Sequence, residues 1–470
     1  MEKSAENSDN GSIRKIIIPL IAIALGMLMV IIDGTAMNVV VPVMVKNFKS
    51  NLSTVSWIIT GYGLAQAMVI PLAGWLSDHF GPKLVFLLSM TLFTLGSLLC
   101  STAANLNMLI IFRIIQGLGG GMVIPAAIIL TFKLSPPGKV GKVMSFIGIP
   151  TMLGPSLGPV LAGYLVDVVS WRAIFYINIP LGILGLLIGL KTIPNFKGHK
   201  VPSMDYMGII LAPLAFLMLT FGVNQGSNGW TSYKALVPII LGIIVFIIFV
   251  INELKMHEPL LEMKVFKNWS FNRGMIVQSS VQITLFGIVF LIPLILQQVR
   301  GYSVLDTALI MFPSAIASMI IMPFTGIIFD RIGIRVLAIS GMIVLLISVF
   351  MVFNTVDKSI TSLVLSLIVF GIGLGLMNQL NTHNLQVVPM ELVGRVTSLI
   401  NSFMQVITSL TIAGFSTMVV TRYKLHSTQG LGFVAASLSS YREAFIMIGI
   451  FTIIGVAVSF TLRRAKVTKL

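Results

Sequence analysis

The feature that most constrains this chain is its division into fourteen apolar runs, each long enough to cross a lipid bilayer. About 20 apolar residues, rising about 1.5 Å each, span the hydrocarbon core of a membrane. Hydrophobic residues make up 56% of the 470 residues and charged residues only 10%, and no soluble domain of this length could bury that much apolar surface. We therefore expect an all-α polytopic membrane protein. The predicted runs cover roughly residues 16–44, 53–76, 83–102, 107–132, 141–166, 172–191, 205–224, 235–252, 272–298, 304–329, 333–353, 359–385, 394–421 and 443–462.

The distribution of Lys and Arg predicts which side of the membrane each loop faces. Fourteen spans place both termini on one side, and 21 of the 31 basic residues lie in the termini and in every second loop. Cytoplasmic loops carry the excess of basic residues, so both termini are predicted to be cytoplasmic, in the cell membrane of a bacterium. The net charge of +16 is then a topology signal, with anionic lipid headgroups rather than nucleic acid as the partner.

Several kinds of site and segment are excluded by the sequence. The first run is too long for the core of a signal peptide, and no small-residue cleavage site follows it, so we expect an uncleaved first span. The single cysteine, Cys100, leaves no disulfide and no cysteine metal site. No P-loop is present, and the glycine-rich stretches 117–121 and 371–375 follow no strand, so we predict neither a nucleotide nor a cofactor. His257 is no zinc ligand, because Leu261 stands where the second His would be.

An internal repeat divides the chain. Residues 74–83 and 326–335 both read Gly, then Asp four residues later, Gly three later and a base two later. Both fall on predicted cytoplasmic turns, which implies a parallel duplication. We expect a six-helix N-terminal half (1–192), a two-helix insert (193–254) and a six-helix C-terminal half (255–470).

The repeated turns also supply candidate gating residues. Glycine permits the tight geometry, and an acid could cap a helix N-terminus or pair with a base when the cytoplasmic side is closed. A solvated turn is the simpler alternative. The residues concerned are Gly74, Asp78, Gly81, Asp330, Arg331 and Arg335.

The first run contains one acid, Asp33, where no acid is expected. A charged side chain near the middle of a spanning helix costs on the order of 2.5–3.5 kcal/mol on insertion scales. Asp33 should therefore face a water-filled cavity or a partner inside the protein. Two interpretations are open: a carboxylate that binds a proton or cation, or a protonated side chain bonded to a neighbouring helix.

Arg113 in the fourth run is the predicted partner of Asp33. It lies about six residues, or roughly 9 Å, from the outer surface, and Asp33 lies about twice as deep, so direct or water-bridged contact is feasible. Exclusion of water favours a neutral Asp, whereas a nearby guanidinium favours the carboxylate. A change in either between two conformations would load and release a proton. Alternatively, Arg113 bonds backbone carbonyls of the first helix. Gln66 and Gln116 could extend this network or simply join helices.

The fifth run combines two stripes of unusual backbone chemistry. Gly154 and Gly158 lie four apart on one helix face and permit close helix approach. Pro155 and Pro159 form the adjacent stripe and favour bends. We expect a bent helix that packs closely against the other half and acts as a gate, with ordinary packing as the alternative.

Several segments are similar to signatures of one transporter family. Together they resemble the major facilitator superfamily, and specifically its fourteen-helix drug:proton antiporter branch. The resemblance implies the major facilitator fold with six, two and six helices, secondary active transport rather than enzymatic catalysis, and a fifth helix that closes leak paths. Pro82 departs from the Arg usual in the first turn. The matching segments are 33–42, 74–83, 113–117, 148–163, 171–180 and 258–261.

We expect export of amphipathic, drug-like compounds in exchange for protons, by alternating access of a monomer. Because Asp33 is the only acid predicted deep in a helix, the resemblance favours neutral or monovalent substrates. Transport of one metabolite, such as a lipid, fatty acid or siderophore, is an open alternative. A membrane-embedded enzyme or sensor is a remote one, since no buried nucleophile, metal cluster or soluble module is visible. The predicted cavity walls, between the halves near the midplane, are Met29, Met37, Asn38, Tyr62, Gln66, Gln116, Gln278, Gln282, Phe286, Phe290, Asn378 and Gln379.

Overall fold

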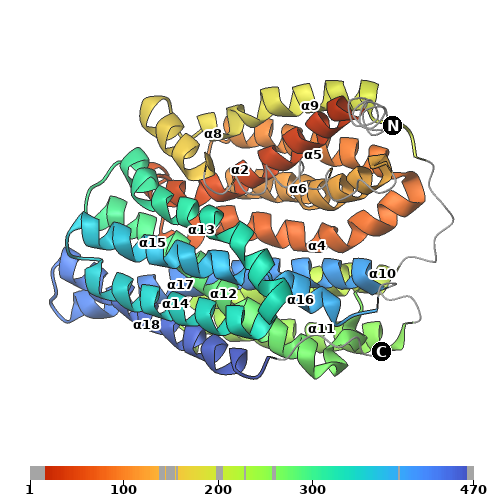
Figure 1. Cartoon of the computed structure of the whole chain (residues 1–470). Coiled ribbons are helices and arrows are strands. Elements are labelled where there is room, and N and C mark those ends of the chain that lie inside the picture. Colours follow the sequence, from red (N-terminus) through yellow and green to blue (C-terminus); the bar gives the residue numbers. More distant parts are fainter. Residues whose placement is uncertain are drawn as a thin grey trace, which may run out of the picture.

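The chain folds into a bundle of long helices (Figure 1). The computed structural model describes residues 16–136, 143, 154, 157–196, 205–226, 229–256, 261–389 and 392–462. Within these residues all regular elements are helical, and 13 helices are long and apolar enough to cross a membrane. A shorter apolar helix, Leu157–Val168, occupies the end of the fifth predicted run, most of which lies outside the described residues.

The helices before residue 193 form one group, called here the N-terminal group. Neutral side chains start two of them: Asn51 accepts a hydrogen bond from the Thr54 N–H, and Asn105 accepts one from the Met108 N–H. The group contains α2 (Ile17–Asn47), α3 (Leu52–Val55), α4 (Trp57–Phe80), α5 (Pro82–Thr102), α6 (Leu106–Leu134), the helix Leu157–Val168, α8 (Ala173–Tyr176) and α9 (Asn178–Thr192).

Two helices follow that pack mainly on each other, α10 (Tyr206–Gln225) and α11 (Tyr233–Lys255). Along its length α10 also contacts α4 and α17 (Val393–Thr428). At its last residues α10 is bonded on two sides. Asn224 exchanges hydrogen bonds of 2.7 and 2.9 Å with Ser53, and Thr417 Oγ1 donates to the Asn224 carbonyl at 3.3 Å.

The remaining helices form the C-terminal group. The twelfth predicted run is broken in the structure, because α15 stops at Met377 and α16 starts at Leu380. The group contains η2 (Met263–Lys267), α12 (Trp269–Leu294), the π-turn η3 (Ile295–Val299), α13 (Val304–Ile332), α14 (Ile334–Thr355), α15 (Ile360–Met377), α16 (Leu380–Gln386), α17 and α18 (Phe433–Ser459).

The last helix begins ten residues before the predicted run, because polar residues of its first turns are paired. Glu443 bonds both Arg422 and His426 of α17, at 2.8 and 2.7 Å. Arg442 pairs with Asp357 at 2.8 Å. The same contacts extend α17 beyond the predicted residue 421. A helix can thus continue through paired charged residues beyond the end that is predicted from hydropathy alone.

The repeated turns adopt the same backbone conformation. Gly81, between α4 and α5, has φ 90°, and Gly333, between α13 and α14, has φ 87°. Residues other than glycine rarely adopt such values, so the glycine is required at both turns. The internal repeat read in the sequence therefore corresponds to a repeated local structure.

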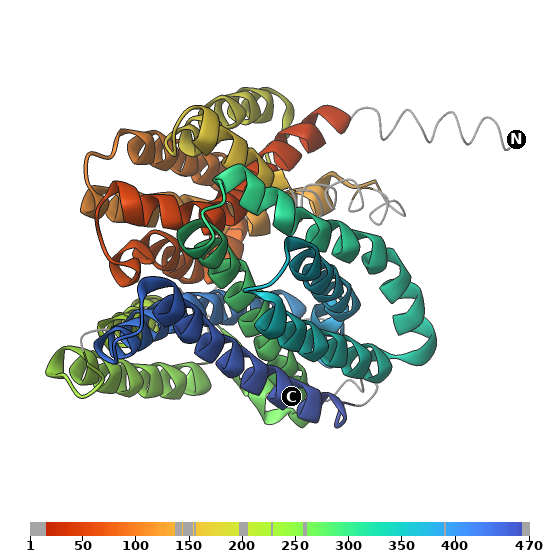
Figure 2. The same ribbon diagram turned by 90° about the vertical axis from the view of Figure 1, so that its left-hand side faces the viewer.

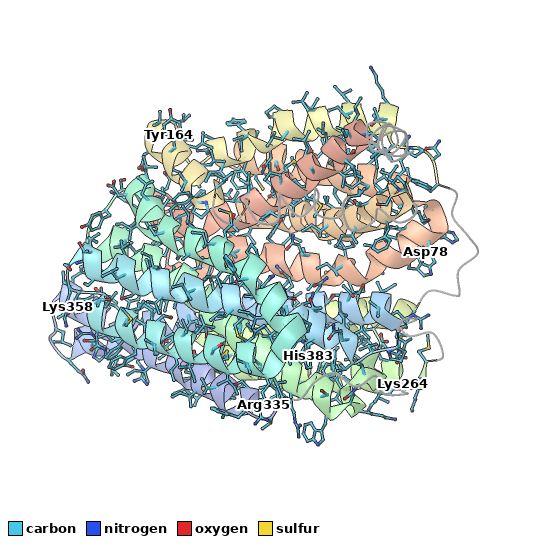
Figure 3. All side chains as sticks on the ribbon, in the orientation of Figure 1. Asp78, Tyr164, Lys264, Arg335, Lys358 and His383 are labelled. Atoms are coloured by element: carbon cyan, nitrogen blue, oxygen red, sulfur yellow. The ribbon has the colours of Figure 1, made fainter. Side chains whose placement is uncertain are left out.

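The two groups lie side by side, the N-terminal group in red to yellow and the C-terminal group in green to blue (Figures 1 and 2). The helices run roughly along one direction, so the bundle has two ends. We call the end where α2 begins and α18 finishes the terminal end, and the other the distal end. Asp78, Lys264 and Arg335 lie toward the terminal end and Tyr164 and Lys358 toward the distal end (Figure 3).

Contacts between the two groups gather from the distal end to the middle of the bundle. Ser56 Oγ lies 3.2 Å from Ser416 Oγ, and Gln297 Nε2 donates to the Val39 carbonyl at 2.7 Å. Toward the terminal end, a Cβ added at Gly74 of α4 would meet no described atom within 4 Å. Among the described residues, hydrogen bonds therefore join the two groups at the distal end and in the middle of the bundle.

Candidate functional site

Asp33 and Arg113 form an ion pair in the interior of the N-terminal group. Arg113 Nη1 lies 2.5 Å from Asp33 Oδ2, and both side chains are 0% exposed. Asp33 comes from the middle of α2 and Arg113 from the second turn of α6. The predicted direct contact between these two residues is present in the structure.

Neutral side chains complete the surroundings of the Asp33 carboxylate. Gln116 Nε2 and Asn178 Nδ2 donate to Asp33 Oδ1 at 3.1 and 3.0 Å. Both amides also donate to Ser97 Oγ, and Gln116 Oε1 accepts a second bond from Arg113 at 2.7 Å. Donors from α6 and α9 thus complete the hydrogen bonds of the Asp33 side chain.

Arg113 has further contacts on α4. Its guanidinium lies 4.0 Å from the ring centroid of Tyr62, a cation–π contact, and its Nε donates to the Ile58 carbonyl at 3.2 Å. The alternative that Arg113 bonds backbone carbonyls of the first helix is therefore wrong, because the carbonyl that Arg113 bonds belongs to α4. Arg113 both pairs with the acid and ties α6 to α4.

A chain of amides continues from this site to the C-terminal group. Gln66 Nε2 donates to the Tyr62 hydroxyl at 3.0 Å, and Gln405 Nε2 of α17 donates to Gln66 Oε1 at 3.0 Å. Since Tyr62 stacks on Arg113, the acid is linked through four contacts to the opposite group.

Glycines allow the helices around the site to approach closely. A Cβ added at Gly96 of α5 would lie 2.6 Å from the Gln116 Cα, and one at Gly117 of α6 would lie 2.6 Å from the Tyr62 carbonyl oxygen. Side chains at these positions would push α5 and α4 away from α6. The glycine-rich stretch 117–121 therefore has a packing role.

The predicted glycine stripe of the fifth helix faces a helix of its own group. A Cβ added at Gly154 would collide with Ile31, and one at Gly158 with Thr35 Oγ1, both on α2. The expectation that this pair packs against the other half is therefore wrong. Pro155 lies outside the described residues, and Pro159 is half-buried within the helix.

Contact with the C-terminal group is made further along the same helix. A Cβ added at Gly163 would lie 2.7 Å from the Leu305 Cα, and Asp167 Oδ2 accepts a hydrogen bond from the Leu305 N–H at 2.9 Å. The close approach of this helix to the other group thus occurs at the distal end, on the first turn of α13.

Half of the predicted cavity residues are buried, and four of them belong to hydrophobic clusters. Met29 and Tyr62 lie in a hydrophobic cluster of the N-terminal group, and Met37 and Phe290 lie in the cluster that joins the two groups. Their assignment to a cavity wall is wrong for this conformation. The buried residues of the predicted set are Met29, Met37, Asn38, Tyr62, Gln116 and Phe290.

The other predicted cavity residues are partly or fully exposed, as a cavity wall requires. Gln282 donates to Thr408 at 2.8 Å, and Gln278 accepts from Asn384 at 2.6 Å, so both are held within the C-terminal group. On the opposite side, a Cβ added at Gly34 would meet no described atom within 4 Å. The set with exposed surface is Gln66, Gln278, Gln282, Phe286, Asn378 and Gln379.

Of the gating candidates in the repeated turns, Asp78 and Arg335 are exposed toward the terminal end, whereas Gly81 is buried and Gly74 is half-buried. Asp78 lies in the last turn of α4 and bonds no described residue, so it caps no helix N-terminus here. Arg335 is exposed in the first turn of α14. The side chains of Asp330 and Arg331 lie outside the described set, as do His257 and residues 258–260 of the predicted signature.

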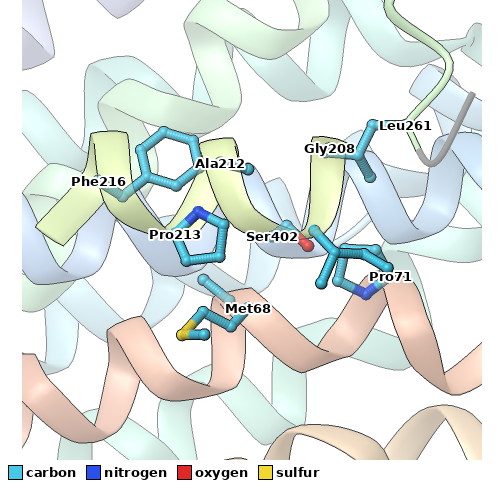
Figure 4. A pocket seen from close by; sticks show the side chains of 10 residues that line it. Met68, Pro71, Gly208, Ala212, Pro213, Phe216, Leu261 and Ser402 are labelled. Atoms are coloured by element: carbon cyan, nitrogen blue, oxygen red, sulfur yellow. The ribbon is translucent and has the colours of Figure 1, made fainter. Parts of the chain in front are cut away.

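A small cavity lies elsewhere, where α10 meets α4 and α17 (Figure 4). None of the predicted cavity residues lines it. Among the described residues, no group of three or more His, Cys, Asp or Glu side chains is arranged to hold a metal ion. The lining residues are Ala67, Met68, Pro71, Gly208, Ile209, Ala212, Pro213, Phe216, Leu261 and Ser402.

Sequence reasoning missed Asn178, Ser97 and Gln405 as members of the Asp33 network. Asn178 falls in the signature segment 171–180, without an assigned role. Ser97 and Gln405 are polar residues that interrupt apolar runs, and this interruption is the only feature of the sequence that could have indicated them.

Comparison with solved structures shows the fold. A peptide transporter POT in complex with sulfate superimposes with a TM-score of 0.67 at 14% identity, covering 95% of this chain and 96% of that one. A bacterial homolog of the human lysosomal transporter Spinster, inward-facing and occupied, gives a TM-score of 0.65 at 17% identity, covering 95% and 96%.

Comparison of sequences shows the family. Among relatives, the uncharacterized MFS-type transporter YhcA of Bacillus subtilis (strain 168) is 32% identical over 87% of this chain and 78% of its own length. Lincomycin resistance protein LmrB of Listeria innocua is 30% identical over 92% and 93%. Multidrug export protein EmrB of Haemophilus influenzae is 32% identical over 74% and 68%. Residues 23–412 match the Major Facilitator Superfamily, and the chain therefore belongs to that superfamily.

Proposed function

We propose that this protein is a proton-coupled antiporter that exports amphipathic, drug-like compounds across the cytoplasmic membrane by alternating access. The observation that carries the proposal is the fully buried Asp33–Arg113 pair, which is connected to the opposite helix group through Tyr62, Gln66 and Gln405. A buried ion pair is costly to form, so its presence at the centre of a transporter favours a functional role.

The proton would act by breaking this pair. Asp33 accepts hydrogen bonds from Arg113, Gln116 and Asn178 in the present conformation, an arrangement suited to the carboxylate. A proton on Asp33 removes the attraction for Arg113 and changes the donors that the carboxyl group can accept. Movement of Arg113 would displace the stacked Tyr62 and, through Gln66, the bond to Gln405. Proton binding would thereby alter the contact between the groups.

The conformation described here would be the inward-facing one. The groups are joined at the distal end, and the termini are predicted to be cytoplasmic from the Lys and Arg distribution. We propose the six, two and six division for the same molecule, supported by the matching glycine turns and by the mutual packing of α10 and α11. One chain contains both groups and their interface, so a monomer would be sufficient for transport.

Drug-like substrates are supported by the names of the relatives and by the residues available. EmrB is named for multidrug export and LmrB for lincomycin resistance. Gln66, Gln278, Gln282 and Phe286 would contact the substrate, since they combine polar and aromatic surface that is partly exposed.

Flux measurements in proteoliposomes test the proposal, with pH and voltage gradients imposed separately. Wild-type protein should exchange several unrelated dyes for protons, and Asp33→Asn should lose pH-driven flux. The matched control is Asp357→Asn, an acid that pairs with Arg442 outside the site and should keep normal flux. Voltage adds about 2.3 kcal/mol per 100 mV for a neutral substrate and nothing for one-for-one exchange with a monovalent cation. Unchanged pH-driven flux in Asp33→Asn would remove the coupling role, and transport of a single compound would favour a metabolite carrier.

A further inference from the structure

Three buried acids lie together at the terminal end, away from the Asp33 site. Asp205 precedes α10, Glu253 lies in the last turn of α11, and Glu262 precedes η2. Their exposures are 4%, 0% and 5%. A buried carboxylate needs compensation by a cation or by hydrogen-bond donors.

Part of this compensation comes from backbone and amide donors. The Gly208 N–H donates to Asp205 Oδ1 at 2.9 Å, and Asn252 Nδ2 lies 3.4 Å from both Asp205 oxygens. The Leu261 N–H donates to Glu253 Oε2 at 3.1 Å. One oxygen of Asp205 and one oxygen of Glu253 are thus held by a backbone N–H, and these bonds fix the direction of the other oxygen of each.

The two remaining oxygens face the same small space beside Gly208. A Cβ added at Gly208 would lie 2.5 Å from Asp205 Oδ2 and 2.5 Å from Glu253 Oε1. Asp205 lies within hydrogen-bonding reach of Glu253. Glu253 Oε1 is completely buried and receives no hydrogen bond from any described donor.

Among the described residues, no Lys or Arg forms an ion pair with Asp205, Glu253 or Glu262. The charged groups that act on Glu253 are Asp205 and Glu262, both acids. The basic residues of the adjoining segments are Lys255 and Lys267, which are exposed, Lys264, which is half-buried, and Arg395 on α17.

We propose that Asp205 and Glu253 form a proton-binding pair, in which one proton taken from water lies between Asp205 Oδ2 and Glu253 Oε1. Two neighbouring buried carboxyl groups cannot both ionise without strong repulsion, so one proton is retained by the pair. The shared proton supplies the donor that Glu253 Oε1 lacks.

A proton fits this space better than a metal ion. The Asp205–Glu253 pair leaves only two oxygens without a backbone donor, whereas Ca²⁺ takes six to eight oxygen ligands. The described residues also contain no metal-binding group of three or more acids, His or Cys.

The pair joins three segments at a junction of the fold. It connects the start of α10, the end of α11 and Leu261, which lies just before η2. Gly208 and Leu261 also line the cavity where α10 meets α4 and α17 (Figure 4). Loss of the proton would separate the carboxylates and loosen α10 from its neighbours. This site is independent of the Asp33 mechanism and does not require it.

Thermal stability and infrared spectroscopy of the purified full-length protein in nanodiscs test the pair without any transport measurement. Glu253→Gln keeps an oxygen for the Leu261 N–H and adds a donor toward Asp205. It should be at least as stable as wild type at pH 7. Because the folded wild type binds a proton that the unfolded chain releases above about pH 4–5, wild-type stability should fall as pH rises, by up to tenfold in the unfolding equilibrium per pH unit. The melting temperature of the variant should fall less, so their difference should grow with pH.

Infrared difference spectra provide the second readout. A protonated-carboxyl band should be present in wild type and in Asp33→Asn near neutral pH, and absent in Glu253→Gln and Asp205→Asn. A Glu253→Gln variant less stable than wild type at pH 7, or a band that survives both substitutions, would overturn the proposal. A melting temperature raised by CaCl₂ at fixed ionic strength in wild type alone would also overturn it, in favour of a metal site.

Discussion

The Asp33 site and the Asp205–Glu253 pair are two ways of keeping an acid inside a membrane protein. Asp33 has a guanidinium at 2.5 Å and two amide donors. Glu253 has one backbone donor and faces a second acid. Burial is nearly complete at both places, so the two sites differ in their partners and not in their burial. Under the two proposals, a fixed cation favours the charged form of an acid, whereas a second acid favours retention of a proton.

The first way to break this comparison is to neutralise each acid and measure transport. Asp33→Asn should reduce pH-gradient-driven efflux to the background of empty liposomes, because the proposed coupling group is gone. Glu253→Gln should keep efflux within about twofold of wild type, because the pair is not connected to the Asp33 network. Equal losses in the two variants would mean that both acids belong to one proton pathway.

Removing the guanidinium should make the first site behave like the second. Arg113→Leu should destabilise the protein by up to about 3–5 kcal/mol, the usual cost of leaving a buried charge unpaired. Asp33 can reduce that cost by binding a proton, so a new protonated-carboxyl infrared band should appear. The double variant Arg113→Leu/Asp33→Asn should lack the band and regain stability. A carboxylate that stayed ionised in Arg113→Leu would contradict the idea that the cation holds the charge.

The Asp33 site differs from the second pair in its link to the other helix group, and Gln405 tests that link. Gln405→Leu removes the bond to Gln66, worth about 1 kcal/mol, or roughly fivefold in an equilibrium. Without this bond the two helix groups should separate more often. Distances between spin labels at the distal ends of α4 and α17 should therefore shift toward longer values. Gln282→Leu is a matched control, because its bond to Thr408 stays within one group and should leave these distances unchanged.

The smallest effect is expected from giving the second pair a cation. Asn252 lies 3.4 Å from both Asp205 oxygens, so Asn252→Arg would place a guanidinium beside them. The pair would then lose its proton more readily, so the melting temperature should fall less steeply as pH rises. The change in the free energy of unfolding should be about 0.2–1 kcal/mol, the usual contribution of one partly exposed ion pair. Asn252→Gln, which adds length without charge, should leave the pH dependence as in wild type.

The sequence contained enough to predict the Asp33–Arg113 contact. Two opposite charges within apolar runs are costly when unpaired, so each is the most favourable partner for the other. The sequence also contained the approximate bounds of most of the described helices and the paired glycine turns, although not the early start of α18 or the break between α15 and α16. Neutral members of the network were not predictable in the same way. A hydroxyl in an apolar helix can bond its own backbone, as Ser97 does with the Phe93 carbonyl, so its presence in a run indicates no particular partner.

Other parts failed for different reasons. Glu253 was missed because it lies beside Lys255 at the end of its run, where an acid normally faces water. The spacing of Gly154 and Gly158 predicted a close contact, but spacing cannot say which helix makes it, and α2 does. Large apolar residues such as Met29, Met37 and Phe290 occur both in cavity walls and in hydrophobic cores, so residue type alone cannot distinguish the two. In the structure these three lie in the core.

The double attachment of α10 at its last residues limits how this transporter can move. Asn224 is bonded to Ser53 in one helix group and to Thr417 in the other, so α10 bridges the two groups at the distal end. The distal ends of the two groups could separate only after one of these two sets of bonds breaks. In alternating access, α10 and α11 would then move with one group and past the other.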